Sequence, residues 1–230
     1  MNYSKTILCF ADSRKLTGRC IAGKELDNNQ LGDWVRPVSA RPAEEISITD
    51  RRYQDGTMPR VMDLIYIPMK APKPNGFQQE NHLIDDQYYW VKQGRGTWQD
   101  ALNAVDRTTG PLWLDGDHSY NGMNDRITVA KAAALTSSLI LVKPTDLVLA
   151  VAMEGPDGKR KRKVRAKFRL GNTHYWFSVT DVAVEEAYLK GADGDFPVQD
   201  AILCVSLSEP FNGYTFKLAA AVITPENIGT

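Results

Sequence analysis

A strand-like alternation of apolar and cationic residues is the clearest pattern in the chain. Between Arg162 and Leu170 every second residue is apolar, and the residues between them are Lys or Arg. Side chains of a β-strand point alternately to its two faces, so this period of two predicts a half-buried strand. The apolar run 147–153 predicts a buried strand before it, and the aromatic and β-branched segment 173–180 predicts a third strand after it.

The turn between the last two of these strands determines how their residues pair. Gly171-Asn172 suits a two-residue hairpin loop, because glycine and asparagine accept the backbone angles of tight turns. A slip by one residue would bring apolar residues opposite cations, so we expect a single register. The predicted pairs are Phe168 with Tyr175, Ala166 with Phe177 and Val164 with Val179 on one face, and Lys167 with Trp176 and Arg169 with His174 on the other.

The remainder of the second half completes a recognisable succession of elements. Asp181 is suited to cap a short helix that ends near Gly191. Two further apolar runs, about 201–207 and 214–223, predict strands. The order strand, strand, strand, helix, strand, strand is that of an oligonucleotide-binding (OB) barrel, whose helix lies between the third and fourth strands.

The first half has weaker patterns and predicts an all-β core with inserted loops and short helices. We expect a domain boundary between about residues 136 and 145, which gives an N-terminal domain of residues 1–138 and a C-terminal domain of residues 139–230. The expected strands are 6–10, 19–24, 34–38, 61–68 and 88–92, and the expected helices are 98–105 and 126–135.

Charge is concentrated locally although the chain as a whole is neutral, with 28 basic and 28 acidic residues. Eight of the eleven residues from Lys159 to Arg169 are basic and none is acidic. Cations of this kind neutralise phosphates, and aromatic side chains beside them can stack on bases. The competing interpretation is that the cations keep an exposed sheet soluble and blunt its edge. The predicted contacts are Lys159, Arg160, Lys161, Arg162, Lys163, Arg165, Lys167, Arg169, His174 and Trp176.

A second group of basic and aromatic residues lies in the first half. Trp34 and Arg36 are two residues apart, so they would share one face of a strand. Acidic residues are interleaved with these cations, and salt-bridged loops are therefore the alternative to a ligand site. The residues predicted to contact nucleic acid here are Arg14, Lys15, Arg19, Trp34 and Arg36.

Motifs of catalysis are missing from the sequence. There is no HExxH, no P-loop, no GxGxxG after a strand and no GxSxG. Asp115, Asp117 and His118 with Asp125 form a local polar group, but turns are rich in aspartate for backbone reasons alone. We therefore expect no catalytic residue, no metal and no cofactor.

The location expected for this chain is the cytoplasm. Its three cysteines show no CxxC spacing, and no apolar run approaches the roughly 20 residues of a membrane span. The apolar run 7–10 is too short for the core of a signal peptide. We expect no membrane partner.

Several segments carry a resemblance to a known family. They are Cys9–Lys15, Gly18–Lys24, Trp34–Ser39, Glu80–Asp85, Asn124–Ile127 and Phe216–Leu218. Together they resemble the prokaryotic dual OB-containing domain family over nearly the whole chain. The resemblance implies a mainly β protein with short helices and two OB-like β-barrels, the first with long loops and inserted helices. It brings no catalytic residues to this chain, and it suggests a role beside phage-defence or DNA-processing enzymes.

These observations together predict a non-catalytic protein that binds nucleic acid. Single-stranded DNA or RNA is preferred as the partner because OB grooves favour exposed bases. One alternative is a protein-interaction subunit of a larger complex, in which the basic strand docks an acidic partner. The other is a sensor or enzyme for a nucleotide or modified base that uses an N-terminal pocket.

Overall fold

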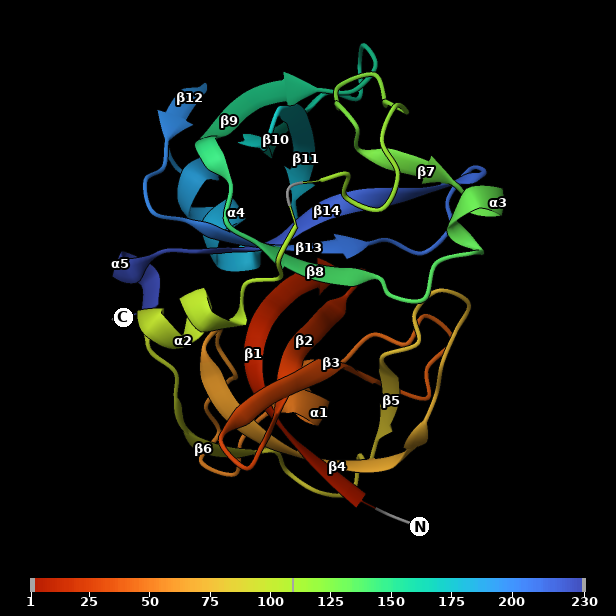
Figure 1. Cartoon of the computed structure of the whole chain (residues 1–230), viewed down its shortest axis with the longest axis vertical. Coiled ribbons are helices and arrows are strands. Elements are labelled where there is room, and N and C mark those ends of the chain that lie inside the picture. Colours follow the sequence, from red (N-terminus) through yellow and green to blue (C-terminus); the bar gives the residue numbers. More distant parts are fainter. Residues whose placement is uncertain (1–2, 109, 229–230) are drawn as a thin grey trace. The chain divides into compact units, whose positions relative to one another are not determined.

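The computed structural model describes residues 3–108 and 110–228 and divides the chain into two compact units (Figure 1). The first unit comprises the chain up to Ala104 together with Thr136–Ser138, and the second comprises Val105–Leu135 and Leu139–Asn227. This division differs from the predicted boundary at residue 138, because residues 105–135 have most of their contacts within the second unit.

The first unit is an OB barrel. Its strands follow one another in the order β1-β2-β3-β5-β4, and β4 pairs back to β1 and closes the ring. The β3–β5 pair is parallel, and the other pairs are antiparallel. The elements are β1 (Tyr3–Lys15), β2 (Gly18–Asp27), β3 (Gln30–Val38), α1 (Ile48–Arg51), β4 (Asp63–Pro72) and β5 (Asn81–Ile84), followed by β6 (Val91–Arg95) and α2 (Trp98–Ala104).

The long strand β1 closes this barrel because it serves two partners. Its first half pairs with β4 from Tyr3 to Leu8, and its second half pairs with β2 up to Lys15. A bulge between Cys9 and Ala11 bends the strand where it changes partner. Gly23 on β2 faces this bend, where an added Cβ would lie 2.3 Å from the Leu8 carbonyl oxygen.

The second unit repeats the same strand order, β9-β10-β11-β14-β13, with β11 and β14 parallel. Here the first strand is split at residues 143–144. The segment before the split, β8, pairs with β13, and the segment after it, β9, pairs with β10. Pro144 cannot donate a backbone hydrogen bond, which accounts for the break. The elements are β8 (Leu139–Val142), β9 (Thr145–Glu154), β10 (Lys161–Leu170), β11 (Thr173–Val179), α4 (Val182–Leu189), β12 (Gly194–Pro197), β13 (Ile202–Leu207), β14 (Tyr214–Ile223) and α5 (Pro225–Ile228).

The predicted β10–β11 hairpin is confirmed in its register. Phe168 pairs with Tyr175, Ala166 with Phe177 and Lys167 with Trp176. The helix α4 begins after Asp181, whose carboxylate accepts a hydrogen bond from the Val184 amide at 3.2 Å, as the capping prediction requires. The fold class, mainly β with short helices and two OB-like barrels, is therefore the predicted one.

The predicted helix at 126–135 is wrong over its first part. Residues Arg126–Thr128 form the strand β7, which pairs with β14, and only Val129–Ala132 form a helix, α3. The Thr128 hydroxyl caps that helix by accepting from the Lys131 amide. The alanine-rich composition of this segment favours a helix. Residues 126–128 nevertheless lie beside β14, and their backbone hydrogen bonds to that strand outweigh the helix propensity. Three further short strands, β5, β8 and β12, were not predicted.

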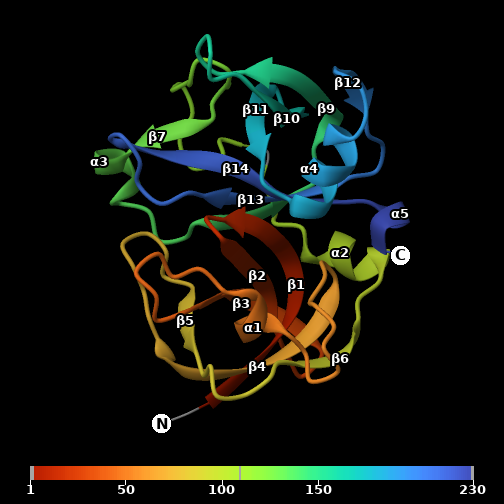
Figure 2. The same cartoon turned by 180° about the vertical axis from the view of Figure 1, so that it is seen from behind.

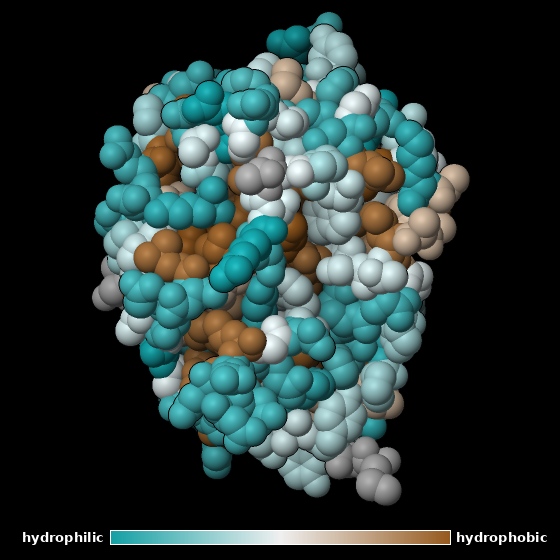
Figure 3. All heavy atoms as spheres, viewed as in Figure 1, coloured by the Kyte–Doolittle hydropathy of each residue, from teal (hydrophilic) through white to brown (hydrophobic). Residues whose placement is uncertain are grey.

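Each unit has its own apolar core inside its strands. The inward residues of β10 and β11 include Phe168, Tyr175 and Phe177, whose rings contact one another with centroids 5.2 to 5.4 Å apart. On the face drawn in Figure 3, hydrophilic residues cover much of the surface and apolar residues form separate patches. No helix within the described residues is long and apolar enough to cross a membrane.

Candidate nucleic-acid interface

The strand β10 of the second unit carries most of the basic residues, and its neighbours in the sheet are β9 and β11. Along β10 the odd-numbered residues Lys163 to Arg169 alternate with the buried apolar residues Val164 to Leu170, so their side chains point away from the core. On β11 the exposed residues His174 and Trp176 have the same outward direction. The hairpin register places Trp176 opposite Lys167 and His174 opposite Arg169.

Acidic residues outside the basic run compensate most of its charge. Five of the eight cations between Lys159 and Arg169 form ion pairs with acidic residues of the described range 110–228. The basic run is therefore not the row of uncompensated charges that its composition indicated. Arg165 has the tightest of these contacts, with two hydrogen bonds to one carboxylate. The pairs are Arg160 with Asp157 (3.2 Å), Arg162 with Asp193 (2.7 Å), Arg165 with Glu154 (2.5 and 2.8 Å) and with Asp125 (3.9 Å), Lys167 with Asp195 (3.1 Å) and Arg169 with Asp146 (2.8 Å).

Three lysines of the basic run have no acidic partner in the described part of the chain. Lys159, Lys161 and Lys163 are exposed and have no ion pair there. They lie at the turn between β9 and β10 and at the start of β10. The uncompensated positive charge of the basic run is therefore gathered at one end of the outer face.

An open groove of about 490 Å³ crosses this face. Its floor includes Ala150 and Ala152 on β9, of which Ala150 is buried and Ala152 is exposed. The strand β12 lies beside β9 (Figures 1 and 2). It contributes Asp195, which pairs with Ala150 across the sheet. The side chains that can bind a ligand along the groove are Tyr120, Asn121, Arg165, Lys167, Trp176 and Asp195.

Lys167 links the charged and aromatic parts of this groove. Its ammonium lies 3.1 Å from Asp195 and 5.5 Å from the centre of the Trp176 ring. A cation over a tryptophan face is attracted by the negative charge of the ring. Because the lysine and the Asp195 side chain are both partly exposed, a bound phosphate could replace the carboxylate.

A buried cluster behind β11 holds the segment that borders the groove. The Lys217 side chain is fully buried, and its Nζ lies 2.9 Å from Asp115 and 2.6 Å from the Leu114 carbonyl oxygen. The Tyr175 hydroxyl donates to the same Asp115 carboxylate at 2.7 Å. Burial lowers the pKa of the Lys217 ammonium and raises the pKa of the Tyr175 hydroxyl. The polar group predicted in this segment therefore makes contacts within the protein.

The predicted residues of the first unit do not form one exposed site. Arg36 is buried and lies 3.3 Å from Glu80. The strand pattern predicted that Arg36 would contact a ligand, but its side chain is buried because β3 lies beside β5 and the residue before it. Arg19 lies 3.4 Å from Asp12, so the salt-bridged alternative applies to that residue. Arg14 is exposed and pairs with Arg19 across the β1–β2 hairpin, next to Lys15 at its tip.

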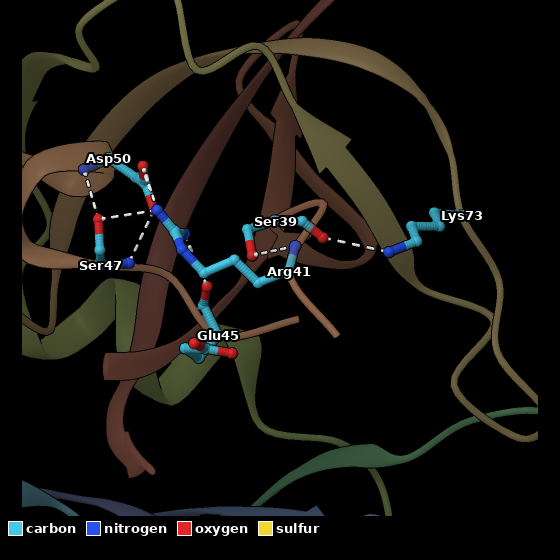
Figure 4. A network of polar contacts seen from close by, with 6 residues as sticks. All are labelled: Ser39, Arg41, Glu45, Ser47, Asp50 and Lys73. Atoms are coloured by element: carbon cyan, nitrogen blue, oxygen red, sulfur yellow. Dashed lines mark hydrogen bonds and ion pairs between the residues drawn. The ribbon is translucent and has the colours of Figure 1, made fainter. Parts of the chain in front are cut away.

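The loop between β3 and α1 illustrates the same compensation of charge (Figure 4). The Arg41 guanidinium donates to both oxygens of Asp50, at 2.5 and 3.2 Å, and to the Glu45 carbonyl oxygen. The Asp50 carboxylate also accepts from the Ser47 amide, which completes the helix cap. Arg41, the cation of this loop, therefore stabilises its conformation.

Trp34 lines a separate pocket in the first unit. The Lys24 ammonium lies 5.4 Å from the centre of its ring, and Phe10 contacts the ring edge-on. His82 lines the same pocket, and its Nδ1 lies 2.5 Å from the Tyr3 hydroxyl. Burial lowers the pKa of His82. The remaining polar side chains of the pocket are Lys5, Glu25, Asp33, Gln79, Glu80, Thr136 and Ser137.

The sequence pattern missed Tyr120, the alanine floor and Asp195. A tyrosine in a segment rich in Asp, Gly and Asn was a signal for an exposed aromatic residue on a turn. The alanines and Asp195 could not be found in this way, because their position in the groove depends on strand pairing.

Comparison with known proteins yields one match. A family model described as a dual OB-containing domain matches residues 5–222. No curated protein and no solved structure matches the chain.

Proposed function

This chain belongs to the dual OB-containing domain family, and from that premise we propose that its second barrel binds single-stranded nucleic acid without catalysing a reaction. Family membership and fold do not specify a ligand. The proposal rests on the groove across β9, β10 and β11, where an exposed tryptophan and partly exposed cations lie on the outer face of an OB barrel.

The observation that carries the proposal is the position of Trp176 beside Lys167. The indole is 37% exposed and sits in an open groove, so a base can reach its face. Stacking of a base on an aromatic side chain contributes about 1–3 kcal/mol. The Lys167 ammonium, 5.5 Å from the ring centre, is within reach of the phosphate next to a stacked base.

Lys159, Lys161 and Lys163 supply the salt-dependent part of the binding. Each phosphate neutralised on a single strand changes the slope of log K against log salt by about −0.7. These three lysines have no carboxylate to release first, so they contribute more to this slope than the paired arginines. The bound strand then runs from the β9–β10 turn along β10 to Trp176.

Single strands fit this groove better than duplexes. Stacking on Trp176 requires a base whose face is open, and in a duplex both faces of each base are covered by its neighbours. We expect DNA and RNA single strands both to bind, since stacking and phosphate contacts do not require a particular sugar.

The test is fluorescence anisotropy with labelled single-stranded DNA, single-stranded RNA and duplex DNA at about 50 and 200 mM salt. The double variant Lys161→Ser/Lys163→Ser should flatten the salt slope by about 1.4, which is two phosphates at about 0.7 each. Lys131→Ser/Lys190→Ser is the matched control, because both lysines are exposed and lie outside the groove. An equal change in slope for the two double variants would refute the proposed site.

A protein partner is the other outcome of this test. If none of the three nucleic acids binds at low salt, the alternative is that the basic strand docks an acidic protein, and a complex that survives nuclease treatment would support it. A role beside phage-defence or DNA-processing enzymes stays a prediction that rests on the family resemblance.

The pocket at Trp34 supports a second candidate function, recognition of a nucleobase in the first barrel. It combines an indole ring with the carboxylates of Glu25 and Asp33 and the neutral imidazole of His82. Lys5 pairs with Glu25 at 2.5 Å, so the Asp33 carboxylate is the group that favours the amino groups of a base over a phosphate. Thermal shifts with free nucleosides that disappear in Trp34→Ala and persist in Trp176→Ala would support it, and no shift would remove it.

A further inference from the structure

Tyr120 is a fully exposed aromatic residue on an ordered segment beside the groove. Its side chain is 100% exposed and makes no ring contact with the residues that the structure describes. It belongs to the segment between Leu112 and Arg126, which has no regular secondary structure and precedes β7. Tyr120 and Trp176 nevertheless line the same groove.

Hydrogen bonds on both sides of Tyr120 determine the shape of this segment. The Asp125 carboxylate accepts from the Ser119 amide at 2.7 Å and from the Ser119 hydroxyl at 2.5 Å. The His118 Nδ1 accepts from the Asn124 amide at 2.8 Å. An added Cβ at Gly122 would lie 1.8 Å from an Asp125 oxygen, so a larger residue there would displace the carboxylate that binds Ser119. The backbone at Tyr120 is thus held by its own neighbours.

The same segment is attached to the strand that carries Trp176. Met123 and Trp176 exchange backbone hydrogen bonds of 3.4 and 3.0 Å, and the Asn124 amide group donates to the His174 carbonyl oxygen at 3.0 Å. Near the start of the segment, Asp115 binds the buried Lys217. The positions of Tyr120 and Trp176 are therefore coupled through β11.

Ordering an exposed loop around a buried ion pair costs free energy, because a buried ammonium loses its hydration. A loop that is already ordered loses less conformational entropy when a ligand binds. An aromatic side chain with no partner, held at the border of a groove that contains another exposed aromatic ring, is suited to bind a flat ligand.

We infer that Tyr120 is the second stacking residue of the groove and that one unpaired base of a single strand lies between Tyr120 and Trp176. This inference rests on the proposed function and identifies Tyr120 as the residue that determines its specificity for single strands. A base held between two rings must be turned out of any stack with its neighbours, so the site selects flexible single strands against duplexes. Ser119 and Asp125 are positioning residues, because they act on the ligand only through Tyr120.

The experiment pairs protein variants with two oligonucleotides of equal charge, one complete and one in which every base is replaced by an abasic residue. Tyr120→Ala should weaken binding of the complete strand about 5- to 150-fold, the loss of one base stack. It should leave binding of the abasic strand unchanged, because the phosphate contacts remain. Tyr120→Phe should bind like the original protein, since the ring and not the hydroxyl makes the contact.

Tyr88→Ala is the matched control, because Tyr88 is 60% exposed and lies in the first unit. Ser119→Ala removes one hydrogen bond to Asp125 and should weaken binding of the complete strand less than Tyr120→Ala does. If Trp176→Ala weakens binding and Tyr120→Ala does not, the inference is overturned and the proposed function stands. If the unmodified protein binds neither strand, both fail.

Discussion

The carboxylate of Asp195 competes with nucleic acid for Lys167, so its removal should strengthen binding. Asp195→Asn keeps the size of the side chain and removes its charge. The Lys167–Asp195 pair is 3.1 Å long, with side chains 34% and 64% exposed. Exposed ion pairs of this kind contribute about 0.2–1 kcal/mol. A ligand that no longer has to break the pair should therefore bind about 1.4- to 5-fold more tightly at low salt.

Because Asp195→Asn frees the Lys167 ammonium, it should also change the salt dependence of binding. One further neutralised phosphate makes the slope of log K against log salt steeper by about 0.7 for a single strand. Anisotropy titrations of the same labelled strand at four salt concentrations measure both quantities. Asp200→Asn is the control, because Asp200 is 71% exposed, lies 3.9 Å from Lys143 and is outside the groove.

Unchanged or weaker binding of Asp195→Asn, with an unchanged slope, would refute the reasoning. It would mean that phosphates do not reach Lys167 and that the groove is not the path of the strand. A gain of equal size in Asp200→Asn would show only the effect of net charge.

Three further predictions concern stability. Glu80→Gln leaves the buried Arg36 without its counter-charge and should lower the free energy of unfolding by about 3 kcal/mol in urea denaturation, whereas the exposed Glu186→Gln should have no effect. Burial holds the pKa of His82 below 6.5 in the folded state, so the unfolded state takes up the proton first and stability falls as the pH decreases below 6.5. A His82→Gln variant should show a smaller loss over that interval in pH-dependent thermal unfolding. Asp181→Ala removes the acceptor of the Val184 and Val222 amides and should cost about 2 kcal/mol of stability in the same assay.

Local patterns were sufficient where the structure itself is local. The β10–β11 hairpin has a two-residue loop and strict alternation, so its register follows from neighbouring residues alone. The cap at Asp181 is likewise a contact between residues three apart. The split first strand of the second unit was beyond such patterns, because β8 is defined by its pairing with β13 more than 60 positions later in the chain.

The candidate site was predictable only in part. The outward direction of Lys167 and Trp176 followed from strand periodicity, but the ion pair with Asp195 depends on β12 adding to the edge of the sheet. Arg36 had the composition of a binding residue, and its burial beside Glu80 results from the parallel pairing of β3 with β5.

The sequence by itself determined that this protein is built from strands, which of their faces are buried and where the cations gather, because these properties depend on residues a few positions apart. Only the tertiary structure decided which cations remain unpaired and which aromatic residues share a groove. Electrostatic interactions act over a few ångströms in space, and Lys167 meets Asp195 only because β12 adds to the edge of the sheet. Tyr120 and Trp176 line one groove because the backbone of Met123 is bonded to that of Trp176.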